Sequence, residues 1–302
     1  MSEPSSVRSP DCVTEVIDPP TQRRSRSLLR RLFERKIAAL ALAIILVAAL
    51  LALLAPLLPL PDPNVIDAAS RLQSPGSPGH QLGTDELGRD LLSRMIWGGR
   101  ISLLAGFGAA LLSVAIGAAV GLIAGFFGRR IDNILMRMTD VVLAFPSILL
   151  AIGVIAALGA GLPNAMLAVA ISGFPLYARV VRGSVLSVRE LDYVEAARSI
   201  GVSHFGIIRN YILPNILAPI IVAFSLDVGL KIVVTSSLSF LGLGAQPPTA
   251  DWGNMIASGR NYIRTSTHLV MIPGFAIFLV ALCLNVVGDR LRDVLDPRLK
   301  HS

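Results

Sequence analysis

Residues 101–127 read ISLLAGFGAALLSVAIGAAVGLIAGFF, a run of 27 residues without a charged side chain. An α-helix of about 20 apolar residues is long enough to cross the hydrocarbon core of a bilayer. This run therefore predicts a transmembrane helix, and the class of fold depends on how many similar runs flank it.

Four similar runs flank this one, at residues 37–55, 141–178, 212–245 and 269–288. The 38 uncharged residues of 141–178 are long enough for two crossings, and Gly161-Leu162-Pro163-Asn164 provides a turn between them. Only Asp227 and Lys231 place charges in the run 212–245. The pattern predicts an all-α integral membrane protein with six transmembrane helices.

The composition supports this class. Of the 302 residues, 53% are hydrophobic and 16% are charged, whereas soluble domains carry about 25% charged residues. This much apolar surface also excludes a disordered chain, and two cysteines are too few for a disulfide scaffold.

The basic residues predict the orientation in the membrane. The segments on one side of six crossings, 1–36, 128–140, 179–211 and 289–302, carry 20 of the 27 Lys and Arg residues, whereas those on the other side carry six. Basic loops face the cytoplasm, so both termini are expected there. Cytoplasmic flanks that face anionic lipid explain the net charge of +7, and no nucleic-acid partner is expected.

These assignments divide the chain into five parts. They are a disordered, basic cytoplasmic tail (1–30), a first transmembrane helix that serves as an uncleaved anchor (31–60), an extracytoplasmic segment (61–100), a core of five helices (101–288) and a cytoplasmic C-terminal tail (289–302).

The two outer segments contain distinctive polar stretches. Residues 82–90, LGTDELGRD, have glycines on either side of an acidic start, which predicts a short surface helix. Residues 242–255 contain two prolines and several glycines, and Trp252 suits a membrane interface. This second stretch is an interfacial loop, a contact surface for an external partner or part of a gate.

The inner segment 188–214 predicts a helix, a glycine turn and a second helix. Residues 188–198 contain good helix formers, with Leu191, Val194 and Ala197 on one side. Gly201 can end that helix in a left-handed conformation, and a short helix is expected from His204 to a break at Pro214. Such a segment on the cytoplasmic face is a projection that another protein can bind.

Catalytic motifs are missing from the sequence. None of the three lysines follows a glycine-rich phosphate-binding loop, and the four histidines are dispersed without metal-ligand spacing. No nucleophile elbow or paired carboxylates stand out. We expect no catalytic centre, no metal site and no cofactor bound by this chain.

Two features of the membrane spans invite interpretation. Asp227 and Lys231 lie four residues apart on one helix face, so they either neutralise each other or contact a zwitterionic substrate on the translocation path. Gly117, Gly121 and Gly125 form a stripe that allows a second helix to approach closely, either in the core or at a subunit interface.

Several motifs of the chain resemble those of a known family. The inner segment is similar to the EAA motif of importer-type ABC permeases, E-A-A-x3-G-x9-I-x-L-P, which matches at Glu195, Ala196, Ala197, Gly201, Leu213 and Pro214. From residue 30 onward the chain resembles the C-type permease of the dipeptide, oligopeptide, nickel and glutathione importers. Supporting stretches are LGTDELGRD (82–90), LAFP (143–146), SFLGLGAQPP (239–248), WGNM (252–255) and LRDVLDPR (291–298).

The resemblance implies a type I ABC importer permease fold in the bacterial inner membrane. It also implies three kinds of partner beside the lipid bilayer: a homologous second permease in a heterodimer, two cytoplasmic ATPase subunits that use ATP and Mg²⁺, and an external substrate-binding protein. The EAA segment would couple to the ATPases, with Glu195 at the ATPase surface, Gly201 in the turn and Pro214 at the start of the fifth span. The outer candidates for contact with the binding protein are Asp85, Glu86, Arg89, Asp90 and Trp252.

The sequence departs from the family pattern at Tyr211, at Arg290 and at the Asp227 and Lys231 pair. An ion-coupled secondary transporter is the main alternative, although such proteins usually contain inverted repeats around a midplane ion site, and none is evident here. A channel or scaffold is a third alternative, and it would not need the EAA segment. The solute is left open among dipeptides, oligopeptides, glutathione and nickel complexes.

Overall fold

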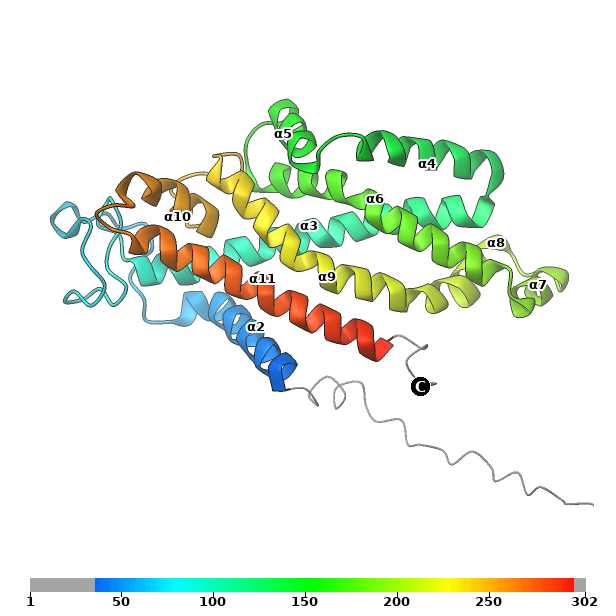
Figure 1. Ribbon diagram of the computed structural model, residues 1–302, viewed down its shortest axis with the longest axis horizontal. Coiled ribbons are helices and arrows are strands. Elements are labelled where there is room, and N and C mark those ends of the chain that lie inside the picture. The colour runs from blue at the N-terminus through cyan, green and yellow to red at the C-terminus, as the bar shows by residue number, and fades with distance from the viewer. Residues whose placement is uncertain (1–35, 296–302) are drawn as a thin grey trace, which may run out of the picture.

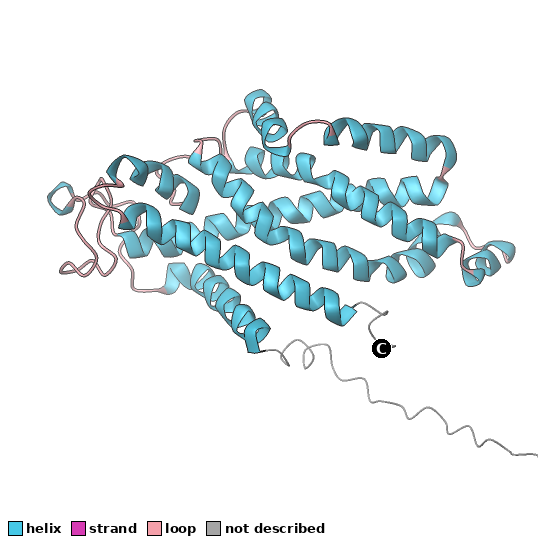
Figure 2. Cartoon of the chain, in the orientation of Figure 1, coloured by secondary structure: helices cyan, strands magenta, loops and turns pink. Residues whose placement is uncertain are grey.

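The computed structural model describes residues 36–295. In this part of the chain the regular structure is helical throughout, apart from two isolated bridge pairs within residues 77–90 (Figure 2). This confirms the predicted all-α class. The predicted tail 1–30, residues 31–35 of the first helix and residues 296–302 lie outside the described range.

Five helical stretches are long and apolar enough to cross a membrane. Their helices are α2 (Lys36–Leu54), α3 (Leu91–Phe127), α6 (Leu162–Arg189), α9 (Leu213–Phe240) and α11 (His268–Leu295). A sixth crossing is reached when α4 (Arg129–Leu143) and α5 (Ser147–Leu158), which are bent by 94° at their junction, count as one span. The structure thus has five span candidates, and the predicted six if the bent pair is one broken span.

The remaining helical pieces are short. Helix η1 (Ala55–Leu57) follows α2 directly, and η2 (Ala68–Ser70) lies in the loop before α3. The others are α7 (Asp192–Ser199), α8 (His204–Ile207), the π-helical turn η3 (Ile208–Ile212), α10 (Trp252–Gly259) and η4 (Arg260–Tyr262).

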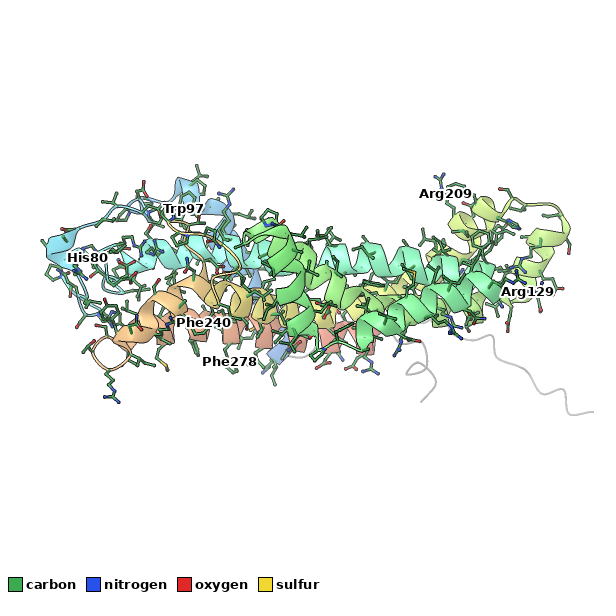
Figure 3. The ribbon with its side chains drawn as sticks, turned by 90° about the horizontal axis from the view of Figure 1, so that it is seen from above. His80, Trp97, Arg129, Arg209, Phe240 and Phe278 are labelled. Atoms are coloured by element: carbon green, nitrogen blue, oxygen red, sulfur yellow. The ribbon has the colours of Figure 1, made fainter. Side chains whose placement is uncertain are left out.

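The long helices run side by side along the long axis of the molecule (Figure 1). Residues 58–90 and α10 gather at one end, here called the loop end, whereas α7 and α8 form the opposite α7 end. Seen from above, His80 marks the loop end, and Arg129 and Arg209 mark the α7 end (Figure 3). The predicted outer and inner segments thus lie at opposite ends of one helix bundle.

Close packing of α3 against α6 forms the centre of the bundle. A Cβ atom built on Gly121 would lie 2.9 Å from the backbone nitrogen of Arg182, and one built on Gly125 would lie 2.8 Å from Cβ of Val185. Both helices approach so closely because these positions carry no side chain. The glycine stripe therefore serves core packing within this chain.

Charge-free runs located the membrane spans but not the ends of the helices. Helix α3 begins ten residues before 101, where the Asp90 carboxylate accepts a hydrogen bond of 2.8 Å from the backbone N–H of Ser93. Helix α11 continues past 288 to Leu295. Both extensions contain charged residues, which a helix tolerates readily beyond the hydrocarbon layer.

Helix α4 corrects the expectation that 128–140 is a connecting segment. Its acidic residues pair with α6: Asp132 contacts Nε of Arg182 at 2.5 Å, and Asp140 contacts Nη2 of Arg179 at 2.7 Å. These pairs join the polar side of α4 to the bundle. At Pro146, an extended backbone with ψ of 126° separates α4 from α5.

Candidate functional site

The segment between α6 and α9 forms the predicted helix–glycine–helix projection. Helix α6 ends at Arg189, Leu191 is extended, and α7 follows from Asp192 to Ser199. Gly201 then adopts a φ of +80°, a left-handed conformation that glycine enters without the penalty of a Cβ atom. Ser203 caps α8 by accepting a hydrogen bond from the N–H of Gly206. The predicted turn at Gly201 is confirmed.

One face of α7 is anchored to the bundle. Val194 and Ala197 are buried in a cluster with Phe126 at the end of α3 and with Ile207 and Ile212. Leu191, expected on the same side, is instead 45% exposed because it precedes the first turn of α7. The apolar anchor ties α7 to the end of α3.

Polar contacts strengthen this anchor. The Arg198 guanidinium lies 5.7 Å from the centre of the Phe126 ring, within the range of a cation–π interaction. His204 meets the same ring edge-on at 5.6 Å. Arg189 donates a hydrogen bond of 2.7 Å from Nη1 to the carbonyl oxygen of Gly125. The tip of α3 is thus held by the end of α6, by α7 and by α8.

The opposite face of α7 is open. Glu195 and Ala196 are exposed, and Ile200 is 78% exposed. An open groove of about 540 Å³ beside α7 is lined by Arg189, Glu190, Glu195, Arg198 and Ser199. A charged groove with an exposed apolar side chain at its edge suits protein recognition, since hydrophobic contact and charge pairing combine there.

The expected helix break at Pro214 is wrong. The chain is helical from His204 through Phe240, and the π-helical turn η3 leads directly into α9. In this turn the N–H of Leu213 donates to the carbonyl of Ile208, five residues back. Pro214 then occupies the first turn of α9, where a missing backbone donor is tolerated. Leu213 and Pro214 are therefore inside a continuous helical segment.

Asp227 and Lys231 form a buried ion pair on α9. Their Oδ2 and Nζ atoms are 3.4 Å apart, and the Tyr177 hydroxyl of α6 donates a 2.8 Å hydrogen bond to the same oxygen. A Cβ atom on Gly173 of α6 would overlap the Lys231 ammonium group. The predicted pairing is confirmed, whereas a substrate contact stays a prediction.

Tyr177 was missed by sequence reasoning. It lies 50 residues from Asp227 in an apolar run, and nothing in its neighbourhood marks it as a partner for a carboxylate. Gly173, one turn earlier on α6, is also part of the cluster because it leaves space for the Lys231 side chain. All three charged or hydroxyl side chains are buried between helices of this one chain.

The stretch 82–90 is not a helix. Gly83 and Gly88 have φ values of +82° and +78°, and a Cβ atom on Gly88 would collide with the carbonyl group of Asp67. The two glycines let the chain turn back on residues 67–73, as the backbone hydrogen bond from Asp67 to Leu87 shows. The predicted surface helix is therefore replaced by a compact double turn.

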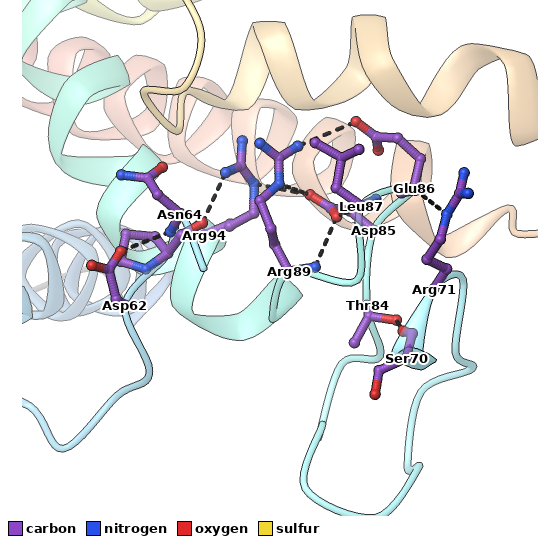
Figure 4. A network of polar contacts seen from close by, with 11 residues as sticks. Asp62, Asn64, Ser70, Arg71, Thr84, Asp85, Glu86, Leu87, Arg89 and Arg94 are labelled. Carbon is purple, nitrogen blue, oxygen red and sulfur yellow. Dashed lines mark hydrogen bonds and ion pairs between the residues drawn. The ribbon is translucent and has the colours of Figure 1, made fainter. Parts of the chain in front are cut away.

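A charge network holds this turn together (Figure 4). Oδ2 of Asp85 lies 2.6 Å from Nε of Arg89 and 3.3 Å from Nε of Arg94, and Oδ1 accepts the N–H groups of Leu87 and Arg89. Glu86 contacts Nη2 of Arg89 at 3.2 Å. The guanidinium groups of Arg89 and Arg94 thereby each have a carboxylate partner, which burial of a charged group requires.

Most of the residues of 82–90 that were predicted to contact the binding protein are buried. Asp85, Arg89 and Asp90 are buried, and Asp90 is occupied by His80 at 2.9 Å and by the cap of α3. Their side chains support the loop and do not present a contact surface in this structure. Glu86 is partly exposed and is the remaining candidate of this stretch.

Trp252 is likewise buried and not exposed at an interface. Its ring packs on Gly98 and Gly99 of α3, and its Nε1 donates a 2.9 Å hydrogen bond to the carbonyl of Met95. It begins α10, which Asp251 caps while accepting a 2.5 Å bond from the hydroxyl of Ser102. Burial raises the pKa of the Asp251 carboxyl group, although these hydrogen bonds oppose the shift. The irregular loop expected over 242–255 ends at residue 251.

Comparison with known families decides the class of protein. Residues 117–301 match the family described as the binding-protein-dependent transport system inner membrane component. The chain belongs to this family. Residues 24–75 match the N-terminal transmembrane domain of oligopeptide transport permease C. The resemblance inferred from the sequence is thereby confirmed.

Curated relatives cover nearly the whole length of this permease. It is 44% identical over 275 residues to the dipeptide transport system permease protein DppC of Alkalihalophilus pseudofirmus, which covers 91% of this chain and 90% of the relative. It is 46% identical over 244 residues to the glutathione transport system permease protein GsiD of Pectobacterium atrosepticum, covering 81% of each.

Solved structures confirm the fold. The inward-facing MetNI methionine ABC transporter matches with a TM-score of 0.54 at 18% identity, over 68% of this chain and 98% of that one. The structure of an amino acid ABC transporter with histidines matches with a TM-score of 0.51 at 18% identity, over 67% and 94%. The permease therefore has the fold of an ABC importer membrane subunit, as predicted.

Among residues 36–295, no group of three or more His, Cys, Asp or Glu side chains is placed to hold a metal ion.

Proposed function

We propose that this permease imports di- or oligopeptides, or related small solutes, through a path formed with a homologous second permease. Two cytoplasmic ATPase subunits supply the energy by binding and hydrolysing ATP with Mg²⁺, and an external binding protein delivers the solute. The names of the relatives support the solute class, since they include dipeptide and glutathione transport permeases.

The observation that carries the proposal is that α7 has one buried face and one exposed face. Val194 and Ala197 fix one face to the bundle, whereas Glu195, Ala196 and Ile200 present the other face to a partner. A helix held in this way transmits force, because a partner that moves it also moves the end of α3. ATPase subunits docked on this face would therefore drive the transport cycle.

Helices α3 and α6 extend this connection through the membrane. Their glycine-mediated packing leaves little space for them to separate, so they are expected to move as one unit. Close-packed helices respond to a load by discrete rigid shifts and not by gradual deformation. Movement at α7 would thereby reach the loop end of the bundle, where α10 packs on α3 through Trp252.

The distribution of charge supports the proposed orientation. The α7 end carries Arg129 and Arg209 (Figure 3), and Arg198 lies in α7 itself. By the positive-inside rule such an end is expected in the cytoplasm. Both termini would then be cytoplasmic, and the loop end would face the binding protein outside the cell. The partly exposed Glu86 and the exposed apolar pair Val65 and Ile66 are available on that side.

An ion-coupled transporter working alone is the weaker alternative. Such a protein needs an accessible ion site near the midplane. The carboxylate of Asp227, the acidic group within α9, is already occupied by Lys231 and Tyr177. This geometry favours a structural ion pair over a site for a transported cation.

The test is solute uptake by cells that carry Glu195→Lys in an otherwise complete transporter. We expect uptake to fall to background while the amount of inserted protein stays at the wild-type level, because only the partner-facing side of α7 changes. Asp293→Lys is the matched control, since Asp293 is a partly exposed acidic residue outside α7. Wild-type uptake by Glu195→Lys would remove the coupling role of α7.

A further inference from the structure

An apolar groove of about 580 Å³ lies between the second half of α2 and the bundle. This volume falls in the range of about 300 to 1,000 Å³ that is usual for ligand sites. Its walls come from α2, α3, α9 and α11, all of which belong to the candidate membrane spans. The lining residues are Ile45, Ala48, Ala49, Ala52, Leu53, Arg100, Leu103, Leu104, Phe107, Val228, Ile232, Val280 and Leu284.

The groove exists because α2 presents small side chains to the bundle. Ala48, Ala49 and Ala52 leave a space that the larger residues of the opposite wall, such as Phe107 and Ile232, do not fill. The groove is open to its surroundings, so an occupant can enter it from the membrane. Within the hydrocarbon layer that occupant is apolar, because no water is available there.

Arg100 is the single charged residue of this lining. It is exposed, and its side chain forms no hydrogen bond or ion pair with another described residue. Helix α3 has 37 residues, or about 55 Å at 1.5 Å per residue, which exceeds a hydrocarbon core of about 30 Å. Arg100 lies ten residues into this helix, so its long side chain reaches the headgroup level at the loop end.

We propose that the groove binds a membrane phospholipid, with one acyl chain between α2 and the bundle and the phosphate on Arg100. The chemistry matches at both ends of the site. A guanidinium binds phosphate oxygens through two parallel N–H bonds, and the apolar walls replace the lipid contacts of an acyl chain. This lipid belongs to the leaflet at the loop end, which the proposed orientation places outside.

The lipid would cover the part of α2 that faces the groove. Leu53, at the end of the groove, is 71% exposed, and a bound acyl chain would cover such side chains while joining α2 to α3, α9 and α11. The inference does not depend on the solute or on ATPase coupling, since it uses only the membrane spans and Arg100.

Thermal unfolding of the full-length chain, purified with its accompanying subunits in mild detergent, tests the site. Addition of long-chain phosphatidylglycerol should raise the Tm of the wild type, whereas inorganic phosphate at the same concentration should not. Loss of hydrogen bonds to a charged group should weaken lipid binding by about tenfold to a hundredfold in Arg100→Gln. Arg264→Gln is the control, because Arg264 is exposed at the same end but outside the groove.

A second pair of variants tests the apolar part. Ala49→Phe fills the groove and should reduce both the Tm increase and the number of phospholipids retained in native mass spectrometry. Leu50→Phe adds bulk on the exposed side of α2 and should leave both unchanged. If Ala49→Phe does not accumulate, Ala49→Leu replaces it.

Three results would overturn the proposal. One is an equal Tm increase from inorganic phosphate alone, which would reduce the site to Arg100. Another is unchanged lipid retention in both Arg100→Gln and Ala49→Phe. The third is a wild-type complex that retains no phospholipid and whose groove is covered by a helix of the second permease, detected as a cysteine crosslink from position 49.

Discussion

The buried cluster of Tyr177, Asp227 and Lys231 allows a quantitative test of how the bundle is held together. Asp227→Asn removes the negative charge but keeps an oxygen that can accept the Tyr177 hydrogen bond. The Lys231 ammonium group then stays buried between α6 and α9 without a counter-charge. Lys231→Met performs the reverse change, because it removes the positive charge and keeps a side chain of similar length.

The expected cost follows from the burial of both groups. Removal of one partner from a buried ion pair destabilises a protein by about 3 to 5 kcal/mol, since an uncompensated charge remains. Replacement of both partners by uncharged groups of similar volume is often neutral. We therefore expect each single variant to lose about 3 to 5 kcal/mol, and the double variant Asp227→Asn/Lys231→Met to lie within about 1 kcal/mol of the wild type.

The assay is reversible unfolding in mixed detergent micelles, with helix content as the signal. Asp140→Asn is the matched control, because Asp140 pairs with Arg179 although both side chains are more than half exposed. Exposed pairs contribute about 0 to 1 kcal/mol, so this variant should be close to the wild type. Uptake by the stable double variant then separates structure from transport: a purely structural cluster predicts an unchanged solute preference.

Two results would refute this reasoning. A loss below about 1 kcal/mol in both single variants, as in the exposed control, would show that the pair is not effectively buried. A double variant as unstable as either single variant would show that each side chain has a separate role. A stable double variant with an altered solute preference would instead support the prediction that Asp227 and Lys231 lie on the translocation path.

Three further predictions follow from other contacts. Gly121→Val should destabilise the bundle by about 1 to 3 kcal/mol because of overpacking between α3 and α6, measured by the same unfolding assay with Gly153→Val, which meets open space, as control. Gly201→Val should cost about 1 to 3 kcal/mol in backbone strain at φ of +80° and lower uptake, whereas Gly201→Asn should retain most of it; equal uptake by both would contradict a role of the turn. Asp85→Asn should leave Arg89 and Arg94 undercompensated and speed proteolysis within residues 61–90, and an unchanged cleavage rate would argue against the network in Figure 4.

The membrane spans were predictable because lipid imposes a simple requirement on the sequence. A segment that crosses the hydrocarbon layer must be apolar over about 20 residues, and each of the five apolar runs overlaps a membrane-span candidate of the structure. The pairing of Asp227 with Lys231 was also predictable, because the two residues lie four apart on one helix. The turn at Gly201 was predictable because it depends on the backbone conformation of a single glycine.

The features that were missed depend on tertiary contacts. The first part of α4 looked like a connecting segment because its charges are conspicuous, yet Asp132 and Asp140 are neutralised by arginines about 40 to 50 residues away on α6. The stretch 82–90 looked helical, but the backbone of Asp67 occupies the space beside Gly88. Trp252 looked interfacial, although Gly98 and Gly99 provide a site for its ring.

Purification of this permease through an affinity tag in mild detergent, followed by mass spectrometry of the associated proteins, tests the central claim most directly. The account predicts that wild-type protein brings a second permease and two ATPase subunits, and that Glu195→Lys retains the second permease but loses the ATPases. Recovery of the wild-type chain alone, active in liposomes without ATP, would contradict it.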